Sequence, residues 1–503
     1  MAWVLFINGP FVRDFCRTQR WAARTRGRVL RAPDWLAYAT AVCERRGHDA
    51  GLFDFPARGW DHERLRWLVQ SEKPDFVVLD TTTPSIYADL RSARIAKDAG
   101  ARVILVGPHA SALPEETLQQ SQGAVDAIAI GEYDETVADI VEASDPATVP
   151  GVCVPGPGGA PVRTPTRPLI RDLDALPFPA WHHLNLLDYF DGTKLYPYID
   201  VVSGRGCPYR CTFCLWPQVM HGHLHRTRKP ECVVDEIEHD IALCPKVLEG
   251  GEFFFEDDTF TVGKAVAHGI ADEILRRRLK IRFSFNARAD ADLDLLRHLR
   301  AAGGRMAVVG FESADPGILR AIGKRTTPEQ GRAFCLAARQ AGIEVHGCFV
   351  LGLPGETLES LEATIEYALS LDLTTVQFSA AVPFPGTAYY RDCAQRGVLR
   401  AKSYEEWLDG GEQGSVVEEP GLSRAEINRH VNEALRRFYF RPGYMLRFLF
   451  ATRDKADLYR KVRGLRNYLG FLAEQRLRSV GIKNNAWPGR ATPSGTNGSS
   501  DAT

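Results

Sequence analysis

The sequence predicts an α/β protein with two successive series of buried strands and helices, followed by a small helical region. In the first third, continuous apolar segments alternate with helical ones, the pattern of a parallel sheet covered on both faces. The strand-like segments are residues 3–8, 50–55, 76–80, 102–107 and 127–131. We therefore expect a doubly wound, Rossmann-like domain over residues 1–149, with its ligand beyond the carboxyl ends of the strands.

A second series follows residues 150–195, a stretch in which proline and glycine predict a linker between domains. Six strand-like segments come next, separated by helical segments. They are residues 199–204, 253–258, 281–288, 306–313, 345–352 and 375–382. Six such units predict a partial (β/α)6 barrel of the TIM type over residues 196–397, with its chemistry at the carboxyl ends of the strands.

The region after the barrel, residues 398–485, is predicted to be helical and basic. Residues 423–483 contain 15 Lys and Arg against 5 Asp and Glu, with aromatic residues between them. Such a surface fits contact with a membrane or a phosphate-bearing lipid, or an amphipathic helix that packs on the barrel with its charges in solvent. The composition of residues 486–503 predicts a disordered tail.

The overall composition and net charge of the chain argue against several classes of protein. The net charge of −1 gives no general reason to expect nucleic acid as a partner. There is no apolar run of 18 residues and no basic, cleavable leader, so we expect a cytoplasmic protein, with contact to a membrane surface left open. The 11 cysteines are an odd number and argue against a disulfide framework.

Three of the cysteines, Cys207, Cys211 and Cys214, stand within eight residues after the first barrel strand. Iron–sulfur clusters are held by cysteine thiolates, normally four. Three thiolates leave one iron without a protein ligand, free to bind the amino and carboxylate groups of a small molecule. A zinc site is the alternative, since three histidines follow at 221, 223 and 225, but no second C-x2-C pair supports it.

This C-x3-C-x2-C motif, with Phe213 directly before its last cysteine and a barrel behind it, resembles the radical S-adenosylmethionine (SAM) superfamily. The resemblance implies a [4Fe–4S] cluster on the three cysteines and SAM contacts at the following strand ends. The implied contacts are Phe213, Glu256, Asp257, Asp258, Asn286, Arg288, Glu312, Ser313 and Gly352. The family's GGE motif usually follows the second strand, whereas Gly250-Gly251-Glu252 precedes it here, so the contacts are placed on residues 256–258.

The first domain adds a second resemblance. The segments VGPHASALPEE (residues 106–116) and AIAIGEYDETV (residues 127–137) are similar to the N-terminal domain of cobalamin-binding radical SAM enzymes, so the resemblance covers residues 1–397. It implies cobalamin at the strand ends, near Asn8, Thr81, Thr83, Ser85, Gly107, His109, Ser111, Gly131 and Glu132. The Asp-x-His-x-x-Gly motif is absent, which implies a lower cobalt face without a histidine ligand. Two alternatives stay open: a domain that binds nothing or another nucleotide, and a His109 that only caps a turn.

The resemblance also implies a reaction. Residues 211–218 and 222–228 are similar to the hopanoid-biosynthesis branch and to natural-product C-methyltransferases of the moenomycin type. We therefore predict a cobalamin-dependent methyltransferase that acts on an unactivated carbon of an antibiotic or other natural-product intermediate, such as a lipid-linked sugar, with flavodoxin or ferredoxin as electron donor. The alternatives are ring contraction or cyclisation without methyl transfer, a non-catalytic cobalamin- or metal-binding protein, and RNA modification.

Overall fold

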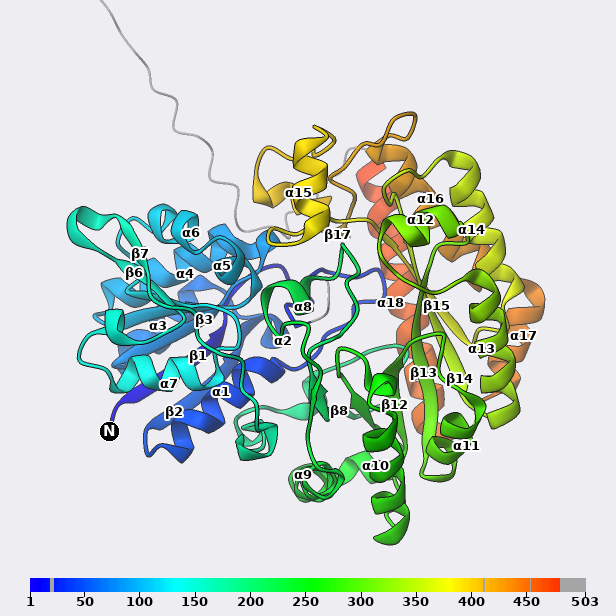
Figure 1. Cartoon of the computed structure of the whole chain (residues 1–503), viewed down its shortest axis with the longest axis horizontal. Helices are drawn as coiled ribbons and strands as arrows, with labels where there is room; N and C mark the ends of the chain where they lie inside the picture. The colour runs from blue at the N-terminus through cyan, green and yellow to red at the C-terminus, as the bar shows by residue number, and fades with distance from the viewer. Residues whose placement is uncertain (19–21, 410–411, 453, 480–503) are drawn as a thin grey trace, which may run out of the picture.

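The computed structural model describes residues 1–18, 22–409, 412–452 and 454–479. It contains two parallel-stranded units that lie side by side in Figure 1, the first coloured blue to cyan and the second green to yellow-green. This confirms the predicted α/β class with a doubly wound unit before a partial barrel.

The first sheet has the strand order β2-β1-β3-β4-β5-β6-β7, and β1 to β5 are parallel. Its parallel strands are β1 (Trp3–Asn8), β2 (Asp49–Asp54), β3 (Phe76–Asp80), β4 (Arg102–Val106) and β5 (Ala127–Ala129). The helices are α1 (Asp34–Arg45), α2 (Phe55–Arg58), α3 (His62–Glu72), α4 (Ile86–Asp98), α5 (Pro108–Ala112), α6 (Pro114–Gln120) and α7 (Asp134–Glu142).

Alternation along β1 explains why both faces of this sheet are covered. Val4 and Phe6 belong to the core that includes α1 and α7, whereas Leu5 and Ile7 belong to the core that includes α3 and α4. Successive side chains of a strand point to opposite faces, so a strand that is apolar at every position needs helices on both sides.

The first part of residues 150–195, the segment predicted to be a linker, forms two strands. Strands β6 (Val152–Pro155) and β7 (Pro161–Arg163) extend the first sheet in antiparallel fashion beyond β5. Val152, Cys153 and Val154 are buried, which accounts for this pairing. Proline is tolerated here because β7 is an edge strand.

The second sheet has the order β15-β14-β13-β12-β11-β8, with all neighbours parallel, and forms the partial barrel. The strands are β8 (Tyr198–Val201), β11 (Glu252–Phe255), β12 (Phe283–Ala287), β13 (Gly304–Glu312), β14 (Glu344–Leu351) and β15 (Thr375–Ala380). The helices are α9 (Pro230–Leu243), α10 (Lys264–Arg276), α11 (Leu293–Ala301), α12 (Pro316–Ala321), α13 (Pro328–Ala341) and α14 (Leu358–Ser370). Capping boxes at Thr327 and Thr357 begin α13 and α14.

The region after the barrel contains α15 (Ala388–Gln395), the short strands β16 (Leu408–Asp409) and β17 (Glu412–Gln413), and the helices α16 (Arg424–Tyr439), α17 (Pro442–Phe450) and α18 (Lys455–Ser479). Helix α16 packs on the barrel: the Tyr439 hydroxyl donates to the carbonyl of Val376 at 2.7 Å, and Arg437 pairs with Glu362 at 2.7 Å. None of the described helices has the length and apolar character needed to cross a bilayer. The predicted tail, residues 486–503, lies outside the described residues.

Candidate cofactor and active site

A short hairpin holds the cysteine loop. Strand β9 (Gly204–Arg205) pairs antiparallel with β10 (Arg226–Thr227), and the three cysteines lie in the loop between them, before and at the start of α8 (Leu215–Val219). Gly206 has φ +85°, and a Cβ there would lie 2.2 Å from the carbonyl oxygen of Leu224. Glycine is therefore required immediately before Cys207, where the loop turns tightly.

The cysteine loop faces one cavity of about 240 Å³ at the mouth of the barrel. All three cysteines and Phe213 line it, together with five other residues that the sequence predicts as SAM contacts. These five are Glu256, Asp258, Asn286, Arg288 and Glu312. Cysteine thiols and polar side chains from successive strands are thus brought to one place, the arrangement needed to hold a cluster and a charged small molecule.

Charged side chains of both signs lie near Cys211. Burial raises the pKa of Cys211 and Glu312 acts in the same direction, whereas Lys324 and Arg288 act to lower it. The guanidinium of Arg288 lies 3.5 Å from the ring centroid of Tyr209, within the loop. Cationic neighbours favour the thiolate, the form that binds iron.

The three cysteine sulfurs do not lie as close together as ligands of one zinc ion do. Tetrahedral zinc with Zn–S bonds of about 2.3 Å needs sulfur atoms about 3.8 Å apart. Among the described residues, the three cysteine sulfurs do not form a group with all atoms within 4.8 Å of one another.

A buried ion pair, Glu312 with Lys324, lies in the cavity wall with 2.6 Å between carboxylate oxygen and Nζ. Glu312 ends β13 with φ +65°, an uncommon backbone state for a non-glycine residue that occurs at functional sites. A Cβ on Gly310 would lie 2.2 Å from a Glu312 carboxylate oxygen and 2.7 Å from Lys324 Nζ. Gly310 thus leaves the space that this pair occupies.

Three predicted SAM contacts, Asp257, Ser313 and Gly352, lie outside the cavity lining. The carboxylate of Asp257 accepts hydrogen bonds from the backbone amides of Ser203 and Gly204 at 2.6 and 2.8 Å. Ser313 Oγ accepts from the amide of Asp315 at 3.1 Å. Both side chains therefore bind neighbouring backbone amides, just beyond the ends of β11 and β13.

Most predicted cobalamin contacts have internal partners at the strand ends of the first sheet. Asn8 accepts from the buried Arg17 at 2.7 Å and donates to Asp54 at 2.9 Å. The other polar groups are similarly engaged: Thr81 Oγ1 donates to the Val106 carbonyl, Ser85 Oγ donates to Asp89, and Ser111 Oγ accepts from the Gly131 amide. Gly107, with φ +95°, would place a Cβ 2.1 Å from Asp80. Any contact of these residues with the corrin remains a prediction.

His109 is different, because one of its ring nitrogens stays unpaired. It is 1% exposed, its Nδ1 lies 3.1 Å from Thr83 Oγ1, and its buried Nε2 has no hydrogen-bond partner in the described part of the chain. Burial lowers the pKa of His109 to about 3, so the ring is neutral. A buried, unsatisfied nitrogen at the carboxyl end of a doubly wound sheet fits a site for a large ligand there.

Two buried ion pairs join the first unit to the cysteine hairpin. Arg226 binds Glu132 through two hydrogen bonds of 2.7 and 2.8 Å, and Arg205 binds Asp134 through two of 2.8 and 2.9 Å. Glu132 also accepts from the amide of Ile170 at 3.0 Å. Protein groups therefore engage both oxygens of this carboxylate, and a contact of Glu132 with cobalamin stays a prediction.

Sequence reasoning did not single out Lys324, Arg31 and Lys194, which also line the cavity. Lys324 follows α12, whereas Arg31 and Lys194 come from loops before α1 and before β8. None of them ends a barrel strand, and no short motif contains them. Their positions depend on tertiary contacts.

Comparison with protein families assigns both units. The model of the radical SAM superfamily matches residues 201–368, and the model of the B12 binding domain matches residues 32–141. The chain is 29% identical over 440 residues to an uncharacterized methyltransferase, PH0819, of Pyrococcus horikoshii, covering 86% of this chain and 93% of the relative. It is 27% identical to the anaerobic magnesium-protoporphyrin IX monomethyl ester cyclase of Rubrivivax gelatinosus, covering 84% and 76% of the two chains.

A solved structure shares the whole fold. The radical SAM methyltransferase TsrM from Kitasatospora setae, solved with cobalamin and a [4Fe–4S] cluster bound, superposes with a TM-score of 0.69 at 19% identity, covering 94% of this chain and 100% of that one. The cofactors of the chain are a [4Fe–4S] cluster, SAM and cobalamin. The chain belongs to the radical SAM superfamily, within the group of cobalamin-dependent enzymes that includes methyltransferases.

Proposed function

We propose that the enzyme transfers a methyl group to an unactivated carbon of an oxygen-rich natural-product intermediate, such as a lipid-linked sugar, in antibiotic biosynthesis. The observation that carries this proposal is the cavity that starts at the cysteine loop and continues into the barrel. When bound, the cofactors supply a methyl group and the one-electron cleavage of SAM. The protein must bind the substrate beside them and exclude water.

The inner part of the cavity offers many hydrogen-bonding groups. His346, Gln377 and Ser379 project from β14 and β15, and Gln413 comes from the region after the barrel. Lys194 is 1% exposed, and its Nζ has no hydrogen-bond partner among the described residues, although it lies 3.5 Å from the ring centroid of Phe254. A buried ammonium without a hydrogen-bond acceptor favours a substrate that brings an oxygen atom to it.

Arg31 holds its place in the same wall through two carboxylates. Its guanidinium lies 2.8 Å from Glu256 and 3.4 Å from Asp191. Arg31 thereby closes one side of the cavity with a segment of the N-terminal unit. We propose that this segment helps to keep water away from the reacting carbon.

The exposed apolar side chains of α17 and α18 favour either a lipid-linked substrate or contact with a membrane surface. Leu446, Phe450, Val462 and Leu465 are each more than half exposed. Basic residues lie on the same helices, which suits an interfacial helix. We place the enzyme in the cytoplasm, at a membrane surface when its substrate is lipid-linked, with flavodoxin or ferredoxin as electron donor.

Product analysis separates methyl transfer from cyclisation, which is relevant because both activities occur among the names of its relatives. The reconstituted enzyme, incubated anaerobically with SAM, reductant and a candidate substrate, is expected to form S-adenosylhomocysteine together with 5′-deoxyadenosine. The product should gain one methyl group by mass spectrometry. Substrate conversion with 5′-deoxyadenosine but without S-adenosylhomocysteine would instead favour the cyclisation alternative.

Replacement of Lys194 tests whether a charged group is buried in the cavity. Burial lowers the pKa of Lys194 from 10.5 to about 8, so between pH 8 and 10.5 the unfolded chain binds more protons here than the folded chain. The wild type should therefore gain stability relative to Lys194→Met as the pH rises through this range. We expect the melting temperature of the variant minus that of the wild type to decrease from pH 7 to pH 10.

The exposed Lys280 provides the matched control for this measurement. Lys280→Met removes a lysine that stays in water, and its difference from the wild type is the baseline against which the Lys194→Met difference is compared. A Lys194→Met difference that changes with pH no more than this baseline would mean that Lys194 is not buried as an ammonium group.

A further inference from the structure

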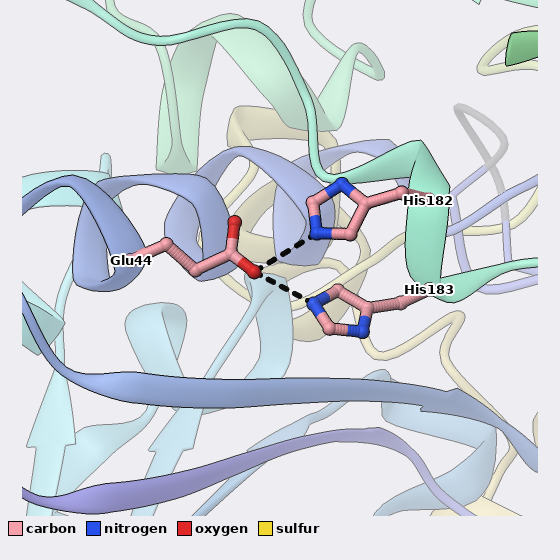
Figure 2. A group of neighbouring side chains, drawn as sticks. All are labelled: Glu44, His182 and His183. Atoms are coloured by element: carbon pink, nitrogen blue, oxygen red, sulfur yellow. Dashed lines mark hydrogen bonds and ion pairs between the residues drawn. The ribbon is translucent and has the colours of Figure 1, made fainter.

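A second group of metal-ligand side chains lies away from the cysteine loop. In the part of the chain that the structure describes, Glu44, His182 and His183 bring one ligand atom each within 4.8 Å of one another. Glu44 lies in the last turn of α1, and the histidines lie in the 3₁₀ turn η5 (Trp181–His183). Figure 2 shows both imidazole rings on one side of the Glu44 carboxylate.

The two histidines point the same nitrogen at one oxygen atom. Nε2 of His182 lies 3.0 Å from Glu44 Oε1, and Nε2 of His183 lies 2.8 Å from the same atom. Neighbours in sequence need not converge in this way, yet their ring centroids are only 4.3 Å apart. Two imidazole nitrogens and one carboxylate oxygen are a donor set that zinc binds.

The size of the group is close to that of a zinc site. With bonds of about 2.1 Å, tetrahedral zinc holds its ligand atoms about 3.4 Å apart. The two nitrogen–oxygen distances are 3.0 and 2.8 Å, so the side chains need to open by about half an ångström. All three side chains are partly exposed, which allows this movement and leaves water to complete the coordination.

The local charge also favours a cation. The carboxylate of Glu44 lies at the end of α1, where the helix carries partial negative charge. The nearby Arg45 and Arg46 are engaged by Glu135, and Arg46 also by Asp139.

We propose that Glu44, His182 and His183 form a zinc site, separate from the iron–sulfur centre, that fastens α1 to the segment leading into the barrel. The two segments already touch, because the amide of Ala180 donates to the carbonyl of Ala37 at 3.1 Å and Trp181 is buried. Zinc would add a cross-link between residues 44 and 182–183 at this junction. Such a site stabilises the folded state because the unfolded chain does not preform it.

Zinc titration of the holoenzyme tests this site. The anaerobic enzyme, with its cluster in place, is freed of loosely bound metal by chelation, titrated with zinc chloride alone and desalted. We expect one zinc ion per chain by elemental analysis and an increase in melting temperature on zinc addition. The His182→Ala/His183→Ala double variant should lose both the bound zinc and the increase.

Two controls make the result specific. His268 and His298 form another histidine contact, with 2.7 Å between their Nδ1 atoms, and their double alanine variant should still bind one zinc ion. Iron content should stay unchanged throughout, which excludes zinc uptake by the cysteines. The proposal is overturned if the wild type binds no zinc, or if the His182/His183 double variant binds it equally well.

Discussion

Replacing Cys211 with alanine is expected to abolish both the iron–sulfur cluster and the cleavage of SAM. Cys211 lines the cavity with Cys207 and Cys214, and two thiolates cannot replace three around a cluster that already has an open iron. After anaerobic reconstitution, the variant should retain little iron and form no 5′-deoxyadenosine above the background without enzyme. Elemental analysis and liquid chromatography measure the two quantities.

The control for this variant is Cys232→Ala. Cys232 lies in α9 and outside the cavity lining, so its loss should leave iron content and 5′-deoxyadenosine formation at the wild-type level. If Cys211→Ala kept its iron and its SAM cleavage, the cysteine loop would not be the cluster site.

Replacing Glu132 with alanine is expected to cost about 3–5 kcal/mol of stability, because it leaves the buried guanidinium of Arg226 without its carboxylate. Arg226 is 6% exposed and Glu132 is 7% exposed, so water does not compensate. Arg226 belongs to β10, which closes the cysteine hairpin. Thermal unfolding should show a marked decrease in melting temperature, and the variant should also load its cluster poorly.

A more exposed ion pair, three residues further along the chain, supplies the comparison. Glu135 in α7 pairs with Arg46, and both side chains are about one quarter exposed. Such pairs contribute about 0–1 kcal/mol, so Glu135→Ala should unfold close to the wild-type temperature. An equally small effect for Glu132→Ala would show that the join between the two units does not depend on the buried pair.

The strands of both units were predictable from sequence because their apolar segments are long and bounded. Residues 3–8 and 76–80 coincide with β1 and β3, and each of the six barrel segments overlaps an observed strand. The cysteine loop was predictable for a different reason, because three thiolates at close spacing have few structural uses. Strands β6 and β7 were missed because proline and glycine around them favour loops, although the edge position tolerates both.

The candidate site could be predicted only in part. The ends of the predicted strands identify the mouth of the barrel as the site. They do not show which of two neighbouring residues faces the cavity: Glu256 and Asp258 line it, whereas Asp257 does not. At the first sheet, Asn8 and Glu132 carry suitable polar groups, but Arg17 and Arg226 engage them. Arg17 reaches Asn8 through an irregular loop, and Arg226 is 94 residues from Glu132 on another unit, so no local pattern reveals these partners. For the same reason, the sequence did not identify Arg31 and Lys194 as residues that line the cavity.

The most direct test of the account is electron paramagnetic resonance of the anaerobically purified, dithionite-reduced protein with and without SAM. An iron left open by the three-cysteine loop predicts a reduced [4Fe–4S] signal whose g-values change when SAM is added. A protein that contains no iron, or a cluster signal that SAM leaves unchanged, would contradict it.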